Sequence, residues 1–152
     1  MYADIVVDVG ISNFDVEPGC IGYLIHPFIF VMMKVVVTGS EGFIGKALCR
    51  ELAKRGVEVI GLDRKCGTEA TEVCELLKNG GIDCVFHLAA QTSVFNGNLE
   101  QIRRDNIDTF MRVADACNQN HVKLIYASSS TANPENITSM YGISKYFDEQ
   151  YA

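Results

Sequence analysis

Short apolar runs alternate with amphipathic segments from Lys34 onwards. The apolar runs are bounded by glycine and polar turn residues, which predicts four buried strands over Lys34 to Val37, Val57 to Leu62, Cys84 to Leu88 and Lys123 to Ala127. Helical spacing occupies the segments between them. Strands that alternate with helices predict an α/β domain, with a parallel sheet covered by helices on both faces and linked by right-handed crossovers.

The first predicted helix follows the first strand through a glycine-rich turn. Its apolar residues recur at i, i+4 and i+8, at Ile44, Leu48 and Leu52. They predict one buried stripe, and Gly56 ends the helix.

Three further helices are predicted, from about Glu69 to Lys78, from near Asn98 to Asn118, and from near Tyr141. One face of the longest is formed by Ile102, Asn106, Phe110, Val113 and Cys117. The asparagine on this face has two interpretations. Either its amide is buried and ties down a neighbouring loop, or its head group reaches water.

Three glycines mark the turn between the first strand and the first helix. Gly39 allows a tight turn, Gly42 lets a phosphate approach the backbone, and Gly45 lets the helix lie close on the strand. The N–H groups at the helix start can then hold a pyrophosphate. Plain strand-to-helix turns also use glycine, so the spacing alone is a weak indication of a dinucleotide site.

Asp63 closes the second predicted strand, 18 residues after Gly45. A dinucleotide-binding unit places here the carboxylate that accepts hydrogen bonds from the adenosine ribose. The alternative is a solvated carboxylate in a turn. Arg64 leaves some room for the 2′-phosphate of NADP, but Asp63 would repel that phosphate, so NAD is the expected cofactor.

Residues 1 to 33 differ from the rest and are interpreted as an N-terminal extension to a domain that spans residues 34 to 152. They contain four acidic residues and no lysine or arginine. The apolar run Ile21 to Met33 covers only 13 residues and lacks a basic leader, so we expect neither a membrane span nor a signal peptide.

Two origins of this extension remain open. The natural start is Met32 or Met33, or else Asp4 to Val9 or Tyr23 to Val31 supplies an extra edge strand.

Composition narrows the function classes. The chain has 152 residues, 48% of them apolar and 21% charged, which is ordinary for one folded domain. Its net charge of −6 argues against nucleic acid or an anionic membrane surface as a partner. The six cysteines show neither a CxxC motif nor metal-ligand spacing, so we expect no metal site and reduced thiols in a cytoplasmic protein.

Tyr141 and Lys145 lie four residues apart in the last predicted helix and so share one face. A nearby ammonium group favours the phenolate, which makes a tyrosine a usable acid or base near neutral pH. Ser130 follows the fourth predicted strand, at the edge where open α/β sheets bind ligands. It could hydrogen-bond a substrate oxygen that exchanges its proton with Tyr141. A chance pair on a solvated helix is the alternative.

Five segments, in order, carry a family resemblance: TGSEGFIG at 38–45, Asp63, HLAAQTSV at 87–94, YASSS at 126–130 and YGISK at 141–145. Through them the chain resembles the extended short-chain dehydrogenase/reductases. More narrowly, it is similar to the NAD-dependent epimerase/dehydratase group typified by UDP-galactose 4-epimerase. The resemblance implies a Rossmann-like doubly wound parallel sheet, here incomplete, with about four to five strands.

The resemblance also implies residue roles. The pyrophosphate loop is matched by Gly39, Gly42, Phe43, Ile44 and Gly45. The adenosine ribose ligand is matched by Asp63, with Arg64 beside it. The segment lining the cofactor is matched by Leu88, Ala89 and Ala90, and the asparagine supporting the active site by Asn106. The catalytic group is matched by Ser130, Tyr141 and Lys145, of which the last two also contact the cofactor.

The family's chemistry implies a nucleotide-sugar substrate. Tyr141 would take a proton from a sugar hydroxyl while the adjacent carbon gives hydride to NAD, Ser130 would share the hydrogen bond, and Lys145 would lower the pKa of Tyr141 and hold the nicotinamide ribose. Epimerases return the hydride to the other face, whereas dehydratases first eliminate water, usually with an acid near the serine. Thr131 and Ala132 offer none, which favours epimerase or dehydrogenase chemistry.

Three departures from the family pattern favour alternatives. No strand is predicted between Arg64 and Gly81, where the family normally has one. Only ten residues separate Ser130 from Tyr141, and the sequence stops at Ala152, before the family's substrate domain. The alternatives are an NAD-binding fragment without turnover, or an assembly module whose open sheet edge pairs with another chain. Homo-oligomerisation is left open.

Overall fold

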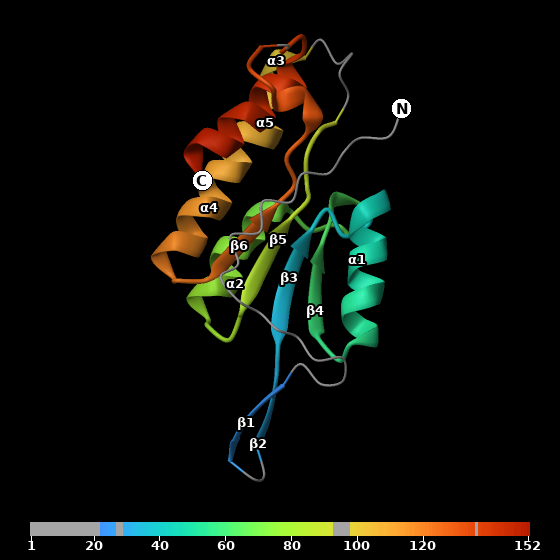
Figure 1. The fold of residues 1–152 in the computed structure, drawn as a ribbon, viewed down its shortest axis with the longest axis vertical. Coiled ribbons are helices and arrows are strands. Elements are labelled where there is room, and N and C mark those ends of the chain that lie inside the picture. The colour runs from blue at the N-terminus through green and yellow to red at the C-terminus, as the bar shows by residue number, and fades with distance from the viewer. Residues whose placement is uncertain (1–21, 27–28, 93–97, 136) are drawn as a thin grey trace.

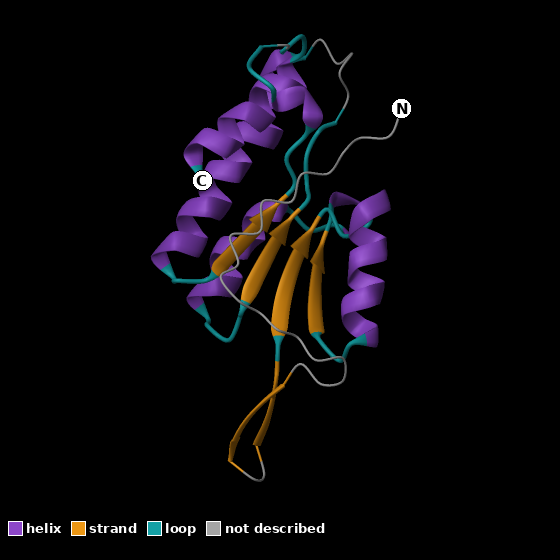
Figure 2. Ribbon diagram, in the orientation of Figure 1, coloured by secondary structure: helices purple, strands orange, loops and turns teal. Residues whose placement is uncertain are grey.

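The structure, a computed structural model, describes residues 22–26, 29–92, 98–135 and 137–152. At its centre lies a sheet of four parallel strands in the order β4-β3-β5-β6 (Figures 1 and 2). The strands are β3 (Lys34–Thr38), β4 (Glu58–Leu62), β5 (Cys84–His87) and β6 (Lys123–Tyr126). The four strands predicted from the apolar runs are confirmed, with ends that differ by one residue.

The helices are α1 (Phe43–Lys54), α2 (Val73–Lys78), α3 (Leu99–Ile102), α4 (Thr109–Gln119) and α5 (Met140–Tyr151). Single turns of 3₁₀-helix form η1 (Arg64–Cys66), η2 (Ala70–Glu72) and η4 (Ser130–Ala132). A wider π-helical turn, η3 (Arg103–Asp108), joins α3 to α4. The long helix predicted after Asn98 is therefore continuous, with a wide turn in its first half.

Helices cover both faces of the sheet, as predicted. Successive residues of a strand point to opposite faces, so the apolar run of β3 supplies two cores. On one face Val35 packs with Leu48 and Leu52 of α1. On the other face Val36 packs with buried residues of α2 and α4, and Figure 1 shows these helices on the side opposite α1. Ile44 does not complete the predicted stripe of α1, because its side chain is 40% exposed.

The predicted buried face of the long helix is confirmed. Each of its members is at most 2% exposed, at Ile102, Asn106, Phe110, Val113 and Cys117. Asp105, the neighbour of Asn106 in η3, is buried as well, with 7% exposure. Two consecutive polar residues are therefore turned inward at the wide turn.

The segment between β4 and β5 contains η1, η2 and α2, and no strand, as predicted. Within the described part of the chain, β4 is consequently an edge strand of the sheet. The loop after β4 thus lies where a further strand of such a sheet would begin.

The expectation that Tyr23 to Val31 supplies an edge strand to the main sheet is wrong. Strands β1 (Gly22–His26) and β2 (Ile29–Met32) instead pair with each other in a separate antiparallel hairpin. Neighbouring positions in the sequence favour this pairing, because a hairpin closes only a short loop. The other candidate, Asp4 to Val9, lies outside the described residues.

Five cysteines in the described ranges are free thiols. Burial raises the pKa of Cys84 to about 11 and that of Cys117 to about 12, so both pack as neutral groups. None of the helices that the structure describes combines the length and apolar character needed to span a bilayer.

Candidate active site

A cavity of ≈ 720 Å³ opens at the carboxyl ends of the strands. Thirteen residues singled out in the sequence line it together, although they come from segments far apart in the chain: Gly39, Gly42, Phe43, Ile44, Gly45, Asp63, Arg64, Leu88, Ala89, Ala90, Ser130, Tyr141 and Lys145. Asn106 is not in the lining. It lies behind the cavity wall, where its side chain is buried.

The glycine turn is close-packed against its neighbours. Gly39 has a left-handed backbone with φ of 70°, and a Cβ there would lie 2.8 Å from the Ala89 nitrogen. At Gly45 a Cβ would lie only 2.1 Å from the Gly39 carbonyl oxygen. The start of α1 is thus held directly against the turn, and both positions require glycine.

The start of α1 can bind an anion. Its N-cap residue, Gly42, has no side chain that could accept a hydrogen bond from the first N–H groups of the helix. These donors and the positive end of the helix dipole lie beside the cavity that Gly42 lines. The arrangement fits a pyrophosphate.

Asp63 is fixed at the cavity edge by the backbone around it. One carboxylate oxygen accepts a hydrogen bond from the Glu41 nitrogen at 3.0 Å, and the other accepts one from the Lys65 nitrogen at 2.9 Å. Each oxygen keeps a further lone pair for a ligand hydroxyl. The position therefore fits the ribose of a dinucleotide.

Thr38 and His87 support the cavity floor. The Thr38 hydroxyl accepts hydrogen bonds from the Leu88 and Ala89 nitrogens, both at 3.2 Å, so its own proton is directed to Nδ1 of His87 at 2.9 Å. Burial, aided by the charge of Lys145, lowers the pKa of His87 to about 3, so the imidazole is a neutral acceptor. Thr38 was not among the predicted site residues. A hydroxyl at the end of an apolar strand was the available signal.

Asn106 ties down the loop after β5, which confirms the first of its two interpretations. Its Oδ1 accepts from the Gln91 nitrogen at 2.7 Å, and its Nδ2 donates to the Gln91 carbonyl oxygen at 3.1 Å and to Ser144 Oγ at 2.9 Å. Ser144 in turn donates to the Tyr141 carbonyl oxygen at 2.7 Å. One buried amide thus links three segments: η3, the loop after β5 and the first turn of α5.

Ser129 and the predicted Ser130 both line the cavity together with Tyr141. Ser129 partly opposes the rise in the pKa of Tyr141. Its Oγ lies 2.8 Å from Thr131 Oγ1 and accepts a hydrogen bond from the Thr131 nitrogen at 3.2 Å. Ser130 begins η4 and is exposed. Ser129 is the N-cap of η4, so the local turn fixes its hydroxyl.

Lys145 has a partner that the sequence analysis missed. Its Nζ donates to Oδ2 of Asp148 at 2.8 Å, and the side chains of both are nearly fully buried. The second oxygen of Asp148 has no hydrogen-bond partner among the described residues. The i, i+3 spacing of the pair was the available signal.

The pKa of Tyr141 differs from the one implied by the resemblance. Burial raises it, the hydrogen bond with Ser129 partly opposes that rise, and the charge of Asp148 adds to it. The expected lowering by Lys145 is not found, because the ammonium group is paired with a carboxylate that offsets its charge. In the described state the phenol is therefore protonated at neutral pH.

Asp148 is expected to make stability depend on pH between 3.8 and about 6. Burial raises its pKa from 3.8 to about 6, against the opposing charge of Lys145, so the folded chain binds this proton more tightly than the unfolded chain. Its contribution to stability is thus fully present below pH 3.8 and is lost as the pH rises through about 6. The nearby charge of Glu149 acts in the same direction, and His87 is neutral throughout this range.

Urea unfolding of the wild type and of Asp148→Asn at a series of pH values measures this contribution. The difference in unfolding free energy between the two proteins should change across this range. The wild type should become less stable relative to Asp148→Asn as the pH rises. Asp115→Asn, at an exposed carboxylate bonded to Tyr151, is the matched control. Parallel curves for wild type and Asp148→Asn would contradict the assignment.

Comparison with protein families gives one extensive match. Residues 35–152 match the model of the NAD dependent epimerase/dehydratase family. The chain therefore belongs to this family.

Individual relatives agree with this assignment. A UDP-2-acetamido-2,6-beta-L-arabino-hexul-4-ose reductase of Pseudomonas aeruginosa is 32% identical, over 78% of this chain and 30% of its own length. A UDP-glucose 4-epimerase of Klebsiella pneumoniae is 29% identical, over 65% of this chain and 91% of its own length.

Solved structures show the same fold. MoeE5 in complex with UDP-glucose and NAD is 30% identical with a TM-score of 0.67, over 78% of this chain and 48% of that one. UDP-glucose 4-epimerase of Thermotoga maritima with UDP-glucose is 25% identical with a TM-score of 0.69, over 78% of this chain and 50% of that one. The chain spans only 30%, 33% and 42% of the length of three of the curated relatives.

Proposed function

We propose that this chain is the NAD-binding and catalytic part of an epimerase-like oxidoreductase that acts on a nucleotide sugar. One observation carries the proposal: the glycine turn, Asp63 and the Tyr141–Lys145 pair line a single cavity. A dinucleotide site and a proton-transfer group are thus side by side, which is what reversible oxidation of a hydroxyl requires.

The geometry supports a binding role for each part of the cavity. The uncapped start of α1 and the glycine turn hold the pyrophosphate, and the carboxylate of Asp63 accepts hydrogen bonds from the adenosine ribose. Leu88 and Ala89, fixed by the Thr38 hydroxyl, form the wall along the cofactor. When bound, NAD supplies the acceptor for a hydride.

The chain's own residues move the proton. In its phenolate form, Tyr141 takes the proton of a substrate hydroxyl and later returns it, and Ser130, which lines the same cavity, shares the hydrogen bond. Lys145 favours the phenolate once its ammonium group turns from Asp148 toward the cofactor ribose. No acidic residue follows the serine directly in the sequence, which favours epimerase or dehydrogenase chemistry over dehydration.

The substrate class rests on the relatives. Two of them are named for UDP-linked sugars, and two solved neighbours contain UDP-glucose. The free thiols of the described cysteines support a cytoplasmic location. The partner we propose is therefore a nucleotide sugar, such as UDP-glucose, in a reducing compartment.

Replacing Asp63 by alanine is expected to weaken NAD binding roughly tenfold or more, because hydrogen bonds to a charged group are lost. Titration of the purified chain with NAD, followed by calorimetry, measures the change. Asp83→Ala is the matched control, since this carboxylate also accepts a main-chain bond, from the Lys34 nitrogen at 2.7 Å, but at the start of β3 and far from the cavity. Equal NAD affinity in the wild type and Asp63→Ala would remove Asp63 from the site.

A second candidate is an NAD-binding chain without turnover. The pairing of Lys145 with Asp148 and the raised pKa of Tyr141 favour it, because they leave the phenol protonated. The two candidates separate when UDP-glucose is added to the NAD-loaded chain. Formation of enzyme-bound NADH, or of UDP-galactose, supports the oxidoreductase, and NAD binding with neither supports the second candidate.

A further inference from the structure

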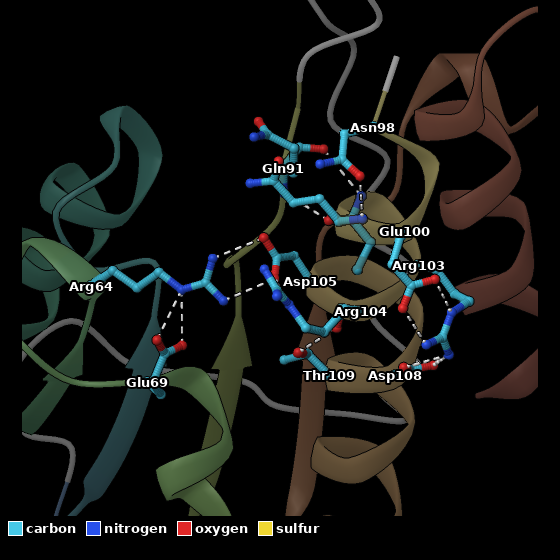
Figure 3. A network of polar contacts seen from close by, with 12 residues as sticks. Arg64, Glu69, Gln91, Asn98, Glu100, Arg103, Arg104, Asp105, Asp108 and Thr109 are labelled. Atoms are coloured by element: carbon cyan, nitrogen blue, oxygen red, sulfur yellow. Dashed lines mark hydrogen bonds and ion pairs between the residues drawn. The ribbon is translucent and has the colours of Figure 1, made fainter. Parts of the chain in front are cut away.

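Arg64 is held by two carboxylates at the end of the cavity next to Asp63. Its Nη1 and Nη2 donate to the two oxygens of Asp105 at 2.9 and 3.0 Å, and its Nε donates to the oxygens of Glu69 at 2.9 and 3.1 Å. Figure 3 shows both carboxylates converging on the one guanidinium group. The fork-to-fork pair with Asp105 is the strong, directional form of this contact.

The two carboxylates come from different segments. Glu69 comes just before η2, in the same segment after β4 as Arg64. Asp105 belongs to η3, which comes after β5 in the chain. The side chain of Asp105 is only 5% exposed and also accepts a hydrogen bond from Arg104 Nε at 3.0 Å. Hydrogen bonds from Arg64 hold the pKa of Asp105 at about 2, so it is fully charged at neutral pH. Arg64 is thus a strut that joins the loop after β4 to η3.

This strut bears on whether a 2′-phosphate can bind at the end of the cavity next to Asp63. The residue after the ribose carboxylate is where an arginine would meet the 2′-phosphate of NADP. Here the charge of Arg64 is already offset twice, and a phosphate would approach three carboxylates, those of Asp63, Glu69 and Asp105. Lys65, the other cation in this part of the lining, directs its ammonium group to the Glu41 carbonyl oxygen at 3.4 Å.

We propose that Asp105 and Glu69 set the cofactor preference of this chain, by holding Arg64 away from a 2′-phosphate and leaving the site to a ribose with a free 2′-hydroxyl. The inference rests on the proposed function, because it presumes a dinucleotide in the cavity. It adds two specificity-determining residues that do not touch the nicotinamide end. It also assigns Arg64 a role different from direct contact with the cofactor phosphate.

Freeing Arg64 is expected to admit NADP. In the double variant Glu69→Gln/Asp105→Asn the guanidinium keeps neutral partners of the same shape but loses both compensating charges. The ratio of NADP affinity to NAD affinity should rise at least about tenfold, the effect of one good charge-assisted contact. Calorimetric titration of the purified chain with each nucleotide, at one fixed salt concentration, measures this ratio.

The helical segment that contains Asp105 also offers a matched control. Arg103 is held in the same way, by Glu100 at 2.8 Å and Asp108 at 2.7 Å, but it does not line the cavity. Glu100→Gln/Asp108→Asn should leave the ratio unchanged. Adding Arg64→Gln to the Glu69/Asp105 double variant should remove the gain, which shows that the gain depends on the arginine and not on lost repulsion alone.

The outcomes are distinguishable. If Asp105→Asn lowers the yield of folded protein, the exposed Glu69→Gln alone tests the same point and should give a smaller gain. NAD binding with an unchanged ratio in both variants overturns this inference and leaves the proposed function standing. Failure of the wild type to bind either nucleotide overturns both.

Discussion

Replacing Asn106 by alanine is expected to lower the free energy of unfolding by about 3 kcal/mol, because several buried hydrogen-bonding groups lose their partner at once. The amide accepts a hydrogen bond from the Gln91 nitrogen and donates to the Gln91 carbonyl oxygen and to the Ser144 hydroxyl. The side chain is 2% exposed, so water cannot replace these bonds without entering the core. Urea denaturation at neutral pH measures the loss.

The same variant should also weaken NAD binding, since the loop after β5 and the first turn of α5 would no longer be tied together. Asn106→Asp separates the two functions of the amide, because a carboxylate still accepts from the Gln91 nitrogen but cannot donate to Ser144. Asn120→Ala is the control: its amide donates to the Ala116 carbonyl oxygen at 2.8 Å on an exposed helix end. A loss at Asn106 no larger than that at Asn120 would show that the buried amide is not what holds these segments.

A single methyl group at Gly45 is expected to cost about 3 kcal/mol of stability and to abolish NAD binding. The new Cβ would lie 2.1 Å from the Gly39 carbonyl oxygen and 2.9 Å from Ser40 Cα. These are backbone atoms, so no side-chain rotation relieves the contact, and the glycine turn must move away from α1. Helix propensity alone would instead favour alanine over glycine by up to about 1 kcal/mol. The sign of the measured change therefore decides between the two effects.

Alanine variants at two other glycines provide a comparison for the stability change expected at Gly45. A Cβ at Gly42 would lie 3.1 Å from the same carbonyl oxygen, so Gly42→Ala should be milder. Gly56 has φ of 77° and no atom near the Cβ position, so Gly56→Ala isolates the cost of the left-handed backbone, about 1 kcal/mol. Thermal unfolding and NAD titration of the three variants give the comparison. A Gly45→Ala protein as stable as the wild type would refute the close packing of α1 on the turn.

Local patterns in the sequence were sufficient to predict the scaffold. The strands were found because both faces of the sheet are buried, which leaves continuous apolar runs such as Lys34 to Val37. The glycine turn and Asp63 line the cavity, a placement that backbone shape and position at a strand end were enough to predict. Asn106 was placed on the correct face by helical spacing, and only the contacts of its amide decided between its two interpretations.

The remaining features depend on contacts that spacing does not reveal. Three consecutive serines follow Ala127 in the chain, and all three line the cavity, so spacing alone does not distinguish their contacts. The spacing of Lys145 and Asp148 permits an ion pair, but it does not reveal that both side chains are nearly fully buried. Arg64 meets Asp105 across 41 residues of sequence, and no local pattern links the two.

The wide turn η3 sets two registers within one helix. Asp105 and Asn106 belong to this turn, where Asp105 lines the cavity and Asn106 is buried, while Phe110 and Val113 follow in α4 and are buried as well. Deleting one residue from 103–108 would make this turn an ordinary α-turn and rotate one set against the other by about 100°. The length of this segment is therefore constrained to the single residue, unlike that of a surface loop. The extra residue thus keeps the polar contacts of the turn and the buried residues of α4 aligned at the same time.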